Sequence, residues 1–218
     1  KEPPHQWSPN TMRQNGAEKR QKVPKVVQVS VDQFYFHYPA GATIVTSYAY
    51  GKQNAMAVAW HTAVSREPPY YAVAISPKRY THRLILESGE FVVNFMPGDK
   101  AELVAAVAGC SGRDIDKFAA FGIRSSPGSQ VRAPVLTDAL AAYECRVTGR
   151  LPCGDHDLFT GSVLAVQYEP SAYAEGLLLE LDGREPILYM GADYYARARG
   201  RTFLERKAPA RRETARGS

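Results

Sequence analysis

Cysteine is scarce in this sequence and long apolar runs are absent. The 218 residues include three cysteines, Cys110, Cys145 and Cys153. They form no CxxC pair and their number is odd, which argues against a disulfide framework or a zinc cluster and favours a reducing compartment. No stretch approaches the roughly 18 apolar residues that span a bilayer, and Lys1-Glu2-Pro3-Pro4 contains no apolar signal core. We therefore expect a cytoplasmic protein without a membrane association.

Several catalytic patterns are also missing. The five histidines, His5, His37, His61, His82 and His156, have no metal-ligand spacing. Neither GxSxG nor a Ser/His/Asp arrangement can be identified, so hydrolysis and metal catalysis are poor explanations and we expect no metal. The sequence also has no GxGxxG after a strand and no regular alternation of strands and helices, which weakens the case for a doubly wound parallel sheet.

Positive charge is concentrated at the two ends of the chain. The formal net charge is +5, but residues 1–25 carry six Lys/Arg against two Glu, residues 195–218 carry eight against two, and residues 26–194 carry 13 against 18. A folded nucleic-acid binder needs its cationic surface on the domain itself, so we do not expect nucleic acid as a partner. We expect a disordered basic arm over 1–25, one domain over 26–195 and a flexible basic tail over 196–218.

Short β-branched runs separated by turn residues predict a mainly β fold with inserted helices. The expected strands cover residues 26–31, with Val27, Val29 and Val31 on one face, then 42–50, 55–60, 70–76, 90–95, 141–150, 158–168 and 186–190. The expected helices run from Pro77 to about Glu87, from Asp99 to Cys110 and from Ile115 to Phe121. Consecutive hairpins with apolar faces bury them best by curling, which favours a closed or split β-barrel.

The segment Ser76–Arg83 has the composition of an anion site. If Ser76 caps a helix that Pro77 opens, the free amides and the helix dipole attract a phosphate, and Arg79, Thr81 and His82 can donate to it. The alternative is an amphipathic helix whose cations face water. Cations at a helix start oppose the usual dipole preference, and this favours the site.

Two further segments suit the rest of a phosphorylated aromatic cofactor. Asn54-Ala55-Met56 and Trp60-His61-Thr62 offer an amide and an indole to the edge and face of a ring, although Asn54 could simply be a turn residue. Ser111, Arg113 and Lys117 could reach an anion, unless Asp114 and Asp116 neutralise the two cations. His156, between two strands, is the one candidate for proton transfer or contact with a second substrate, or else a turn residue.

These segments, in this order, resemble the flavin reductase-like family of FMN-binding split barrels, which includes flavoredoxin and the reductase components of two-component monooxygenases. The resemblance covers about Val31 to Tyr195 and includes Pro39-Ala40-Gly41, Gly89-Glu90-Phe91-Val92-Val93-Asn94 and Gly154-Asp155-His156. It implies a Greek-key split β-barrel and a homodimer with one FMN per subunit near the interface. The residues it implies around the ring and ribityl chain are Thr46, Ser47, Asn54, Ala55, Trp60, His61 and Thr62. For the phosphate they are Arg79, Thr81, His82 and Lys117. The residue pattern itself adds Met56 as a wall of the ring and Ser111 as an anion contact to the expected cofactor site.

The resemblance also implies the reaction. Hydride would pass from NADH or NADPH, entering near His156, to bound FMN, and onward to free flavin, a monooxygenase or another acceptor. Two alternatives stay open. One is an FMN-binding electron carrier or biosynthetic redox enzyme with its own organic substrate. The other is a polyanion-binding protein that acts through its basic tails.

Overall fold

A computed structural model describes residues 24–27, 29, 31, 34–175, 178–198 and 200. The chain divides into two compact units, residues 1–34 and residues 35–218. The described residues of the first unit form no helix or strand, and Val27 and Val29 are 83% and 92% exposed. The predicted strand over 26–31 is therefore wrong, because alternating valines form a strand only when a neighbouring strand pairs with them. Most of the predicted arm and tail lies outside the described residues.

The second unit is mainly β with few helices. In chain order its elements are η1 (Tyr35–His37), β1 (Ala40–Gly41), β2 (Thr43–Ala49), β3 (Lys52–Val58), β4 (His61–Arg66), β5 (Pro69–Ile75), α1 (Tyr80–Ser88), β6 (Glu90–Phe95), η2 (Gly98–Lys100), α2 (Ala101–Ala108), α3 (Lys117–Phe121), β7 (Ser125–Ser126), β8 (Val135–Leu136), β9 (Ala141–Cys153), β10 (His156–Tyr168), η3 (Pro170–Ala172), β11 (Tyr173–Ala174), β12 (Leu178–Leu179), β13 (Ile187–Gly191) and β14 (Tyr194–Arg197).

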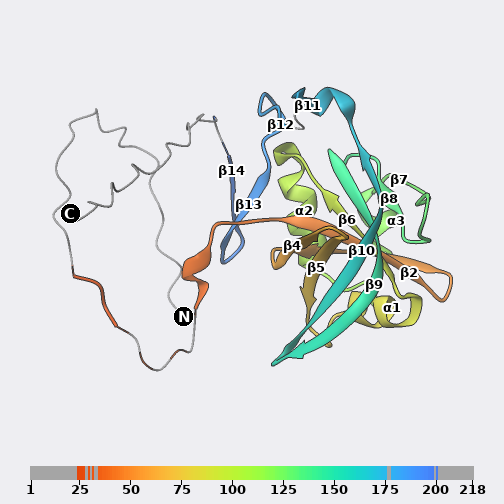
Figure 1. Ribbon diagram of the computed structural model, residues 1–218, viewed down its shortest axis with the longest axis horizontal. Coiled ribbons are helices and arrows are strands. Elements are labelled where there is room, and N and C mark those ends of the chain that lie inside the picture. Colours follow the sequence, from red (N-terminus) through yellow and green to blue (C-terminus); the bar gives the residue numbers. More distant parts are fainter. Residues whose placement is uncertain are drawn as a thin grey trace, which may run out of the picture. The chain divides into compact units, whose positions relative to one another are not determined.

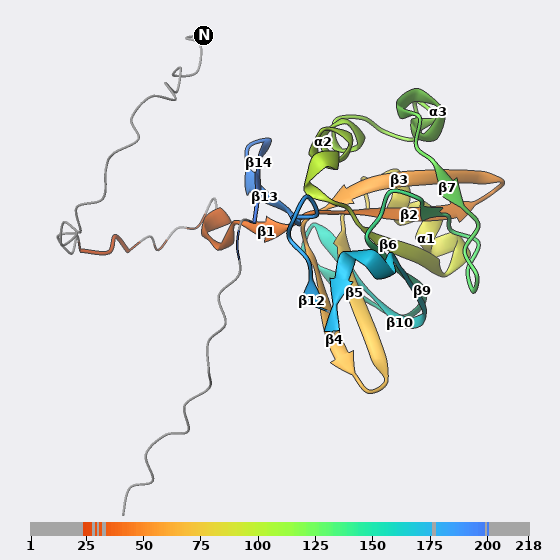
Figure 2. The same cartoon turned by 90° about the horizontal axis from the view of Figure 1, so that it is seen from above.

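Seven strands form one antiparallel sheet in the order β3-β2-β6-β9-β10-β5-β4. The long strands β9 and β10 run through it side by side (Figure 1). Figure 2 shows the β2–β3 and β4–β5 hairpins, which end the sheet on its two sides, extending in different directions. Strands β1, β13 and β14 form a separate small sheet beside it.

The β2–β3 hairpin decides where Asn54 lies. Tyr50 and Gly51 form the turn with φ values of 53° and 72°, the left-handed pair that a two-residue hairpin turn needs. The register then pairs Ser47 with Asn54 across the two strands. Asn54 is therefore a buried strand residue and not the turn residue of the alternative interpretation.

Two apolar clusters make up most of the core on either side of this sheet. One joins Val45, Phe91 and Phe159 with Ile85 of α1, and the other joins Ile44 with Val104 and Val107 of α2 and with Phe118 of α3. The strand expected at 90–95 coincides with β6 in the middle of the sheet, where Phe91 and Val93 join the first cluster and Val92 packs with Val131 and Val135 in a third, smaller one. Helices α2 and α3 pack against β3, which places them beside Asn54.

The helix starts differ from the sequence prediction. The amide of Arg79 donates to the carbonyl of Ser76 at 2.9 Å, so Ser76–Arg79 is a turn with Pro77 inside it, and α1 begins at Tyr80 with Arg79 in the cap position. Proline suits the second position of such a turn as well as the first turn of a helix, and the sequence does not separate the two. Asp99 likewise lies in η2 and caps nothing, whereas Asp116 caps α3 through the amides of Phe118 and Ala119.

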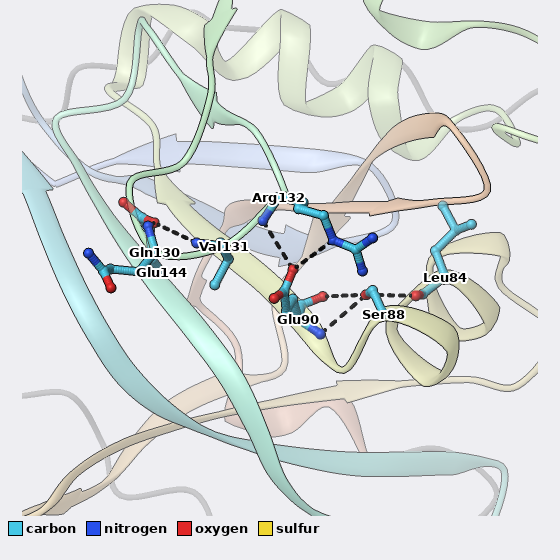
Figure 3. A network of polar contacts seen from close by, with 7 residues as sticks. All are labelled: Leu84, Ser88, Glu90, Gln130, Val131, Arg132 and Glu144. Atoms are coloured by element: carbon cyan, nitrogen blue, oxygen red, sulfur yellow. Dashed lines mark hydrogen bonds and ion pairs between the residues drawn. The ribbon is translucent and has the colours of Figure 1, made fainter.

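Buried carboxylates fasten the loop before β8 to the sheet (Figure 3). Glu144 is fully buried and accepts from the amides of Gln130 at 2.6 Å and Val131 at 3.2 Å. Glu90 accepts from the amide of Arg132 at 3.0 Å and forms an ion pair with its Nε at 3.6 Å. The loop therefore follows the path of β6 and β9, and its Val131 packs on Val92 and Ala142 of these strands.

Candidate functional site

A polar cavity of about 380 Å³ lies where β3, the start of α1, the end of α2 and the loop before α3 meet. Six of the residues predicted from the sequence line it: Asn54, Met56, Arg79, Thr81, Ser111 and Lys117. Lys78, Tyr80 and Arg113 line it as well. The structure thus brings together residues from three separate sequence segments, which is what a binding site for one ligand requires.

Positive charge exceeds negative charge in this cavity, where Lys78, Arg79, Arg113 and Lys117 accompany one carboxylate, Asp114, among the described lining residues. Arg79 is exposed, and it forms no ion pair with any described residue. Lys117 is 4% exposed, and its Nζ donates to the carbonyl of Val107 at 2.7 Å. Burial lowers the pKa of the Lys117 ammonium, and the nearby Arg79 lowers it further against a raising effect of Cys110. Two cations that disfavour each other, one of them buried, are stabilised by an anion placed between them.

Buried polar atoms without partners lie next to the cations. Asn54 donates from Nδ2 to the hydroxyl of Thr81 at 2.7 Å, but its Oδ1 has no partner within the described part of the chain. The Oγ of Ser47, opposite Asn54 in the sheet, is buried and unpartnered in the same sense. A Cβ on Gly112 would lie 2.0 Å from Asn54 Oδ1, so only glycine allows the loop to approach this closely. Unpaired buried polar groups are costly, and a ligand or water that bonds to them offsets the cost.

A narrower slot of about 150 Å³ continues from the polar cavity and shares Met56, Ala57 and Arg79 with it. Trp60 and His156 contact each other at one wall of the slot, with ring centroids 4.8 Å apart and ring planes tilted by 48°. The indole of Trp60 donates to the hydroxyl of Tyr38 at 3.1 Å, which fixes its orientation. His156 begins β10, and its Nδ1 lies 2.8 Å from the carboxylate of Asp155. This hydrogen bond with His156 lowers the pKa of Asp155.

Other predicted residues lie outside both cavities. Thr46 donates to the carbonyl of Pro134 at 2.5 Å, Ala55 is buried in the core, and Thr62 is exposed on β4 and bonds to the carbonyl of Ala63. His61 contacts the hydroxyl of Tyr71 at 2.7 Å and the carbonyl of Gly41 at 3.1 Å. Burial lowers the pKa of His61, so its neutral ring accepts from Tyr71 and donates to Gly41. These four side chains have partners or packing within the protein.

His82 departs most from its predicted role. It is 5% exposed, contacts Asp157 through Nε2 at 2.6 Å and packs edge-on against Phe159. Asp157 also accepts from Arg150 Nε at 2.7 Å. His82 therefore belongs to a buried ion-pair network, because it lies in the first turn of α1 and contacts β10, whereas Arg79 precedes the helix as its extended cap residue. The phosphate role predicted for it has no support in this geometry.

The sequence reading missed residues that the structure places at the site. Ala57 lines both cavities, and Tyr38 lines the slot although Tyr38-Pro39 indicates only a turn. Alternation along β3 does not indicate Ala57, because Ala57 shares its strand face with Ala55 and not with Asn54 and Met56. Tyr38 gives no local signal either, because its contact with Trp60 spans 22 residues of sequence.

No helix in the described ranges has the length and apolar character to cross a membrane. Within those same ranges, no three His, Cys, Asp or Glu side chains lie together as a metal site.

An antiparallel, mainly β domain with a cation-rich cavity that leads into an aromatic slot is the architecture of a cofactor-binding protein. Residues 35–196 match the Flavin reductase like domain, and the chain belongs to that family. It is 32% identical over 155 residues to an uncharacterized protein of Aeropyrum pernix, covering 71% of this chain and 58% of that protein. It is 33% identical over 129 residues to the flavin reductase (NADH) of Kitasatospora aureofaciens, covering 58% of this chain and 65% of that protein.

Solved structures share the fold. An FMN-binding protein from Thermus thermophilus, crystallised with 1-cyclohex-2-enone, superposes with a TM-score of 0.75 at 32% identity, covering 84% of this chain and 100% of that one.

Proposed function

We propose that this chain is an FMN-dependent oxidoreductase that takes hydride from NADH or NADPH. The observation that carries the proposal is the cavity in which Arg79 and the buried Lys117 meet, joined through Met56 to the slot that Trp60 and His156 line. A ligand with a phosphate at one end and a flat ring at the other matches a cationic cavity that leads into an aromatic slot. Its similarity to a relative named flavin reductase (NADH) supports the same reaction.

The residues present fit the cofactor. Arg79 can donate to phosphate oxygens from a flexible, unpaired side chain, and the amides at the start of α1 carry no side-chain cap. Lys117 has one hydrogen bond in the described structure and two further N–H groups to offer. The unpartnered oxygens of Asn54 and Ser47 can accept from a hydroxylated chain or a ring N–H. Each unmatched group of the cavity thus has a complementary group on FMN.

Bound FMN would supply the hydride-accepting chemistry. The protein's part is to hold, orient and shield. Met56 and Trp60 wall the slot and exclude water from it, while Arg79 lies in both cavities and can hold the phosphate end beside the ring end. To His156, paired with Asp155, we assign contact with the incoming nicotinamide.

Finer structural expectations belong to the same proposal. A split β-barrel is supported by the hydrogen bond from His61 of β4 to Gly41, just before β2, because it links the two ends of the sheet. A homodimer is supported by the exposed apolar side chains of Val166 and Tyr168 on β10, which are 52% and 50% exposed. Both stay predictions. So do a cytoplasmic location, a folded domain over 26–195 and the delivery of electrons to flavin or a monooxygenase.

A second candidate is a redox enzyme with its own organic substrate. A larger aromatic cavity borders the slot at Tyr38 and Trp60, and this favours an organic molecule as the second substrate over free flavin alone. The third reading, polyanion binding through the basic ends, concerns residues that mostly lie outside the described ranges.

Substitution of Arg79 tests the proposed function. Arg79→Gln removes a charge-assisted hydrogen bond to phosphate, worth roughly 1.5–3 kcal/mol, so FMN should bind about 10- to 100-fold more weakly. The matched control is Arg83→Gln on the same helix, where Arg83 is exposed and lies over the ring of Tyr50 at 5.4 Å. Equilibrium dialysis measures FMN binding and urea unfolding checks the fold. Equal FMN affinity in the two variants would refute the phosphate assignment.

A further inference from the structure

The largest cavity of the described structure is an aromatic chamber separate from the polar one. Its volume is about 860 Å³, which is in the range of small-molecule sites. It lies between η1, the β13–β14 hairpin and Trp60, and these elements are neighbours in both ribbon views (Figures 1 and 2). Its aromatic lining residues are Tyr35, Tyr38, Trp60, Tyr189, Tyr194 and Tyr195. The described residues that line it include no charged side chain.

The rings of the chamber contact one another and form walls. Tyr38 meets Tyr189 edge to face at 5.1 Å, and Tyr189 lies 5.4 Å from Tyr195. Tyr194 and Met190 at its rim are 72% and 47% exposed. Tyrosine and methionine contact flat apolar molecules well, through ring faces and a polarizable sulfur. Exposed apolar side chains that gather around a cavity point to a ligand more than to solvent.

The hairpin that forms one wall has a constrained backbone. Gly191, Ala192 and Asp193 have φ values of 94°, 48° and 63°. A left-handed conformation is unfavourable for alanine, and unfavourable backbone conformations collect at ligand sites. A Cβ on Gly191 would lie 3.5 Å from the ring of Tyr38, so the turn packs directly on the chamber wall. The nearest acidic group in this turn, Asp193, lines a different, smaller cavity beside Tyr189 and Tyr195.

The chamber borders the slot, and Tyr38 and Trp60 line both cavities. On the slot side the ring of Trp60 contacts that of His156. A molecule in the chamber is therefore separated from the slot by these two side chains, which their mutual hydrogen bond of 3.1 Å holds together.

We propose that this chamber is a binding site for an uncharged, flat aromatic molecule of one or two rings. None of the described lining residues is charged, and this selects against ions, because a charge moved from water into the site has no partner among them. The ring walls select for flat π-systems over aliphatic chains. The inference deepens the proposed function, on which it rests, by naming the chemical class of the organic molecule that enters beside the slot.

Fluorescence of Trp60 tests the chamber. The sequence has two tryptophans, so Trp7→Phe leaves Trp60 as the sole reporter. The probes are 4-nitroanisole, which is neutral, and 4-nitrobenzenesulfonate, an anion with the same ring. The FMN-loaded protein should bind the neutral probe at least about tenfold more tightly than the anion. Equal quenching by both probes, or no saturable quenching by the neutral one, would overturn the proposal.

Variants assign the binding to the chamber. Ala196→Glu places a carboxylate in the lining and should weaken binding of 4-nitroanisole about tenfold or more, while Tyr194→Ser should weaken it about threefold through lost apolar contact. Tyr50→Ser, at an exposed tyrosine in the β2–β3 turn outside the chamber, is the control and should change nothing. An unchanged affinity in Ala196→Glu would overturn the assignment, as would binding that FMN abolishes, because the probe would then occupy the slot.

The two proposals fail separately. FMN retention after dialysis is measured on the same samples. Loss of probe selectivity with FMN retained contradicts the chamber alone, whereas a protein that never retains FMN contradicts the proposed function whatever the probe does.

Discussion

Lys117 offers a prediction in which stability and binding change in opposite ways. Its ammonium is 4% exposed with one hydrogen bond, to the carbonyl of Val107. Lys117→Met keeps the length and apolar stem of the side chain and removes the buried charge. Removing a buried charge in favour of an apolar side chain is often neutral or stabilising, and the lost hydrogen bond costs about 1 kcal/mol. We expect the free energy of unfolding to stay within about 1 kcal/mol of the wild-type value, or to rise.

FMN binding should respond in the other direction. Without Lys117 the phosphate loses a charge-assisted hydrogen bond of roughly 1.5–3 kcal/mol, so FMN should bind about 10- to 100-fold more weakly. Urea unfolding and quenching of FMN fluorescence measure the two quantities. Lys52→Met, at an exposed strand position, controls for the loss of one positive charge. A variant that loses several kcal/mol of stability while its FMN affinity is unchanged would refute the reasoning.

The pH dependence follows from the same residue. Burial holds the pKa of Lys117 below its ordinary value of 10.5. Between the folded pKa and 10.5 the unfolded chain binds the proton more tightly, so the wild-type free energy of unfolding rises with pH in that window. In Lys117→Met this contribution should be absent. FMN affinity should fall as pH rises through the folded pKa, because the deprotonated amine no longer attracts phosphate.

Two further substitutions test the buried networks. His82→Ala removes packing against Phe159 and a hydrogen bond to the carboxylate of Asp157. The free energy of unfolding, measured in urea titrations, should fall by about 3 kcal/mol. A loss confined to FMN binding would instead support the phosphate role of His82. Glu144→Gln should cost about 2 kcal/mol at neutral pH. Burial raises the pKa of Glu144 but its hydrogen bonds, above all from Gln130 and Gln167, hold it below its usual range. The stability that ionised Glu144 contributes is thus fully present above its unfolded pKa and is lost as pH falls through its folded pKa. The free energies of unfolding of the wild type and Glu144→Gln should therefore converge in acid. A difference that stays constant with pH would contradict this prediction.

Much of the sheet could be predicted from local patterns. The β2–β3 hairpin and β6 carry their signals within a few residues, through β-branched runs and a Gly-containing turn, although the turn lies at Tyr50-Gly51 and not at 51–54 between the predicted strands. Strand β4 was missed because Trp60-His61-Thr62 was interpreted as a ligand motif, although a bulge and exposed residues on an edge strand also weaken its alternation.

The candidate site was only partly predictable, for a physical reason. Composition shows that Arg79, Lys117 and His82 are cationic or titratable, but which of them face the cavity depends on where α1 begins. A start at Tyr80 directs Arg79 into the cavity and His82 into the core. The aromatic chamber depends on contacts between η1 and the β13–β14 hairpin, which are more than 140 residues apart in the sequence. No local pattern indicates such a juxtaposition.

A comparison of FMN with riboflavin tests the central claim most directly, because the two differ only in the phosphate that the cavity of Arg79 and Lys117 is proposed to hold. Dissociation constants measured by flavin fluorescence on the same FMN-free protein should differ by about 100-fold or more in favour of FMN, since two charge-assisted contacts are at stake. Equal affinity for the two flavins would contradict the account.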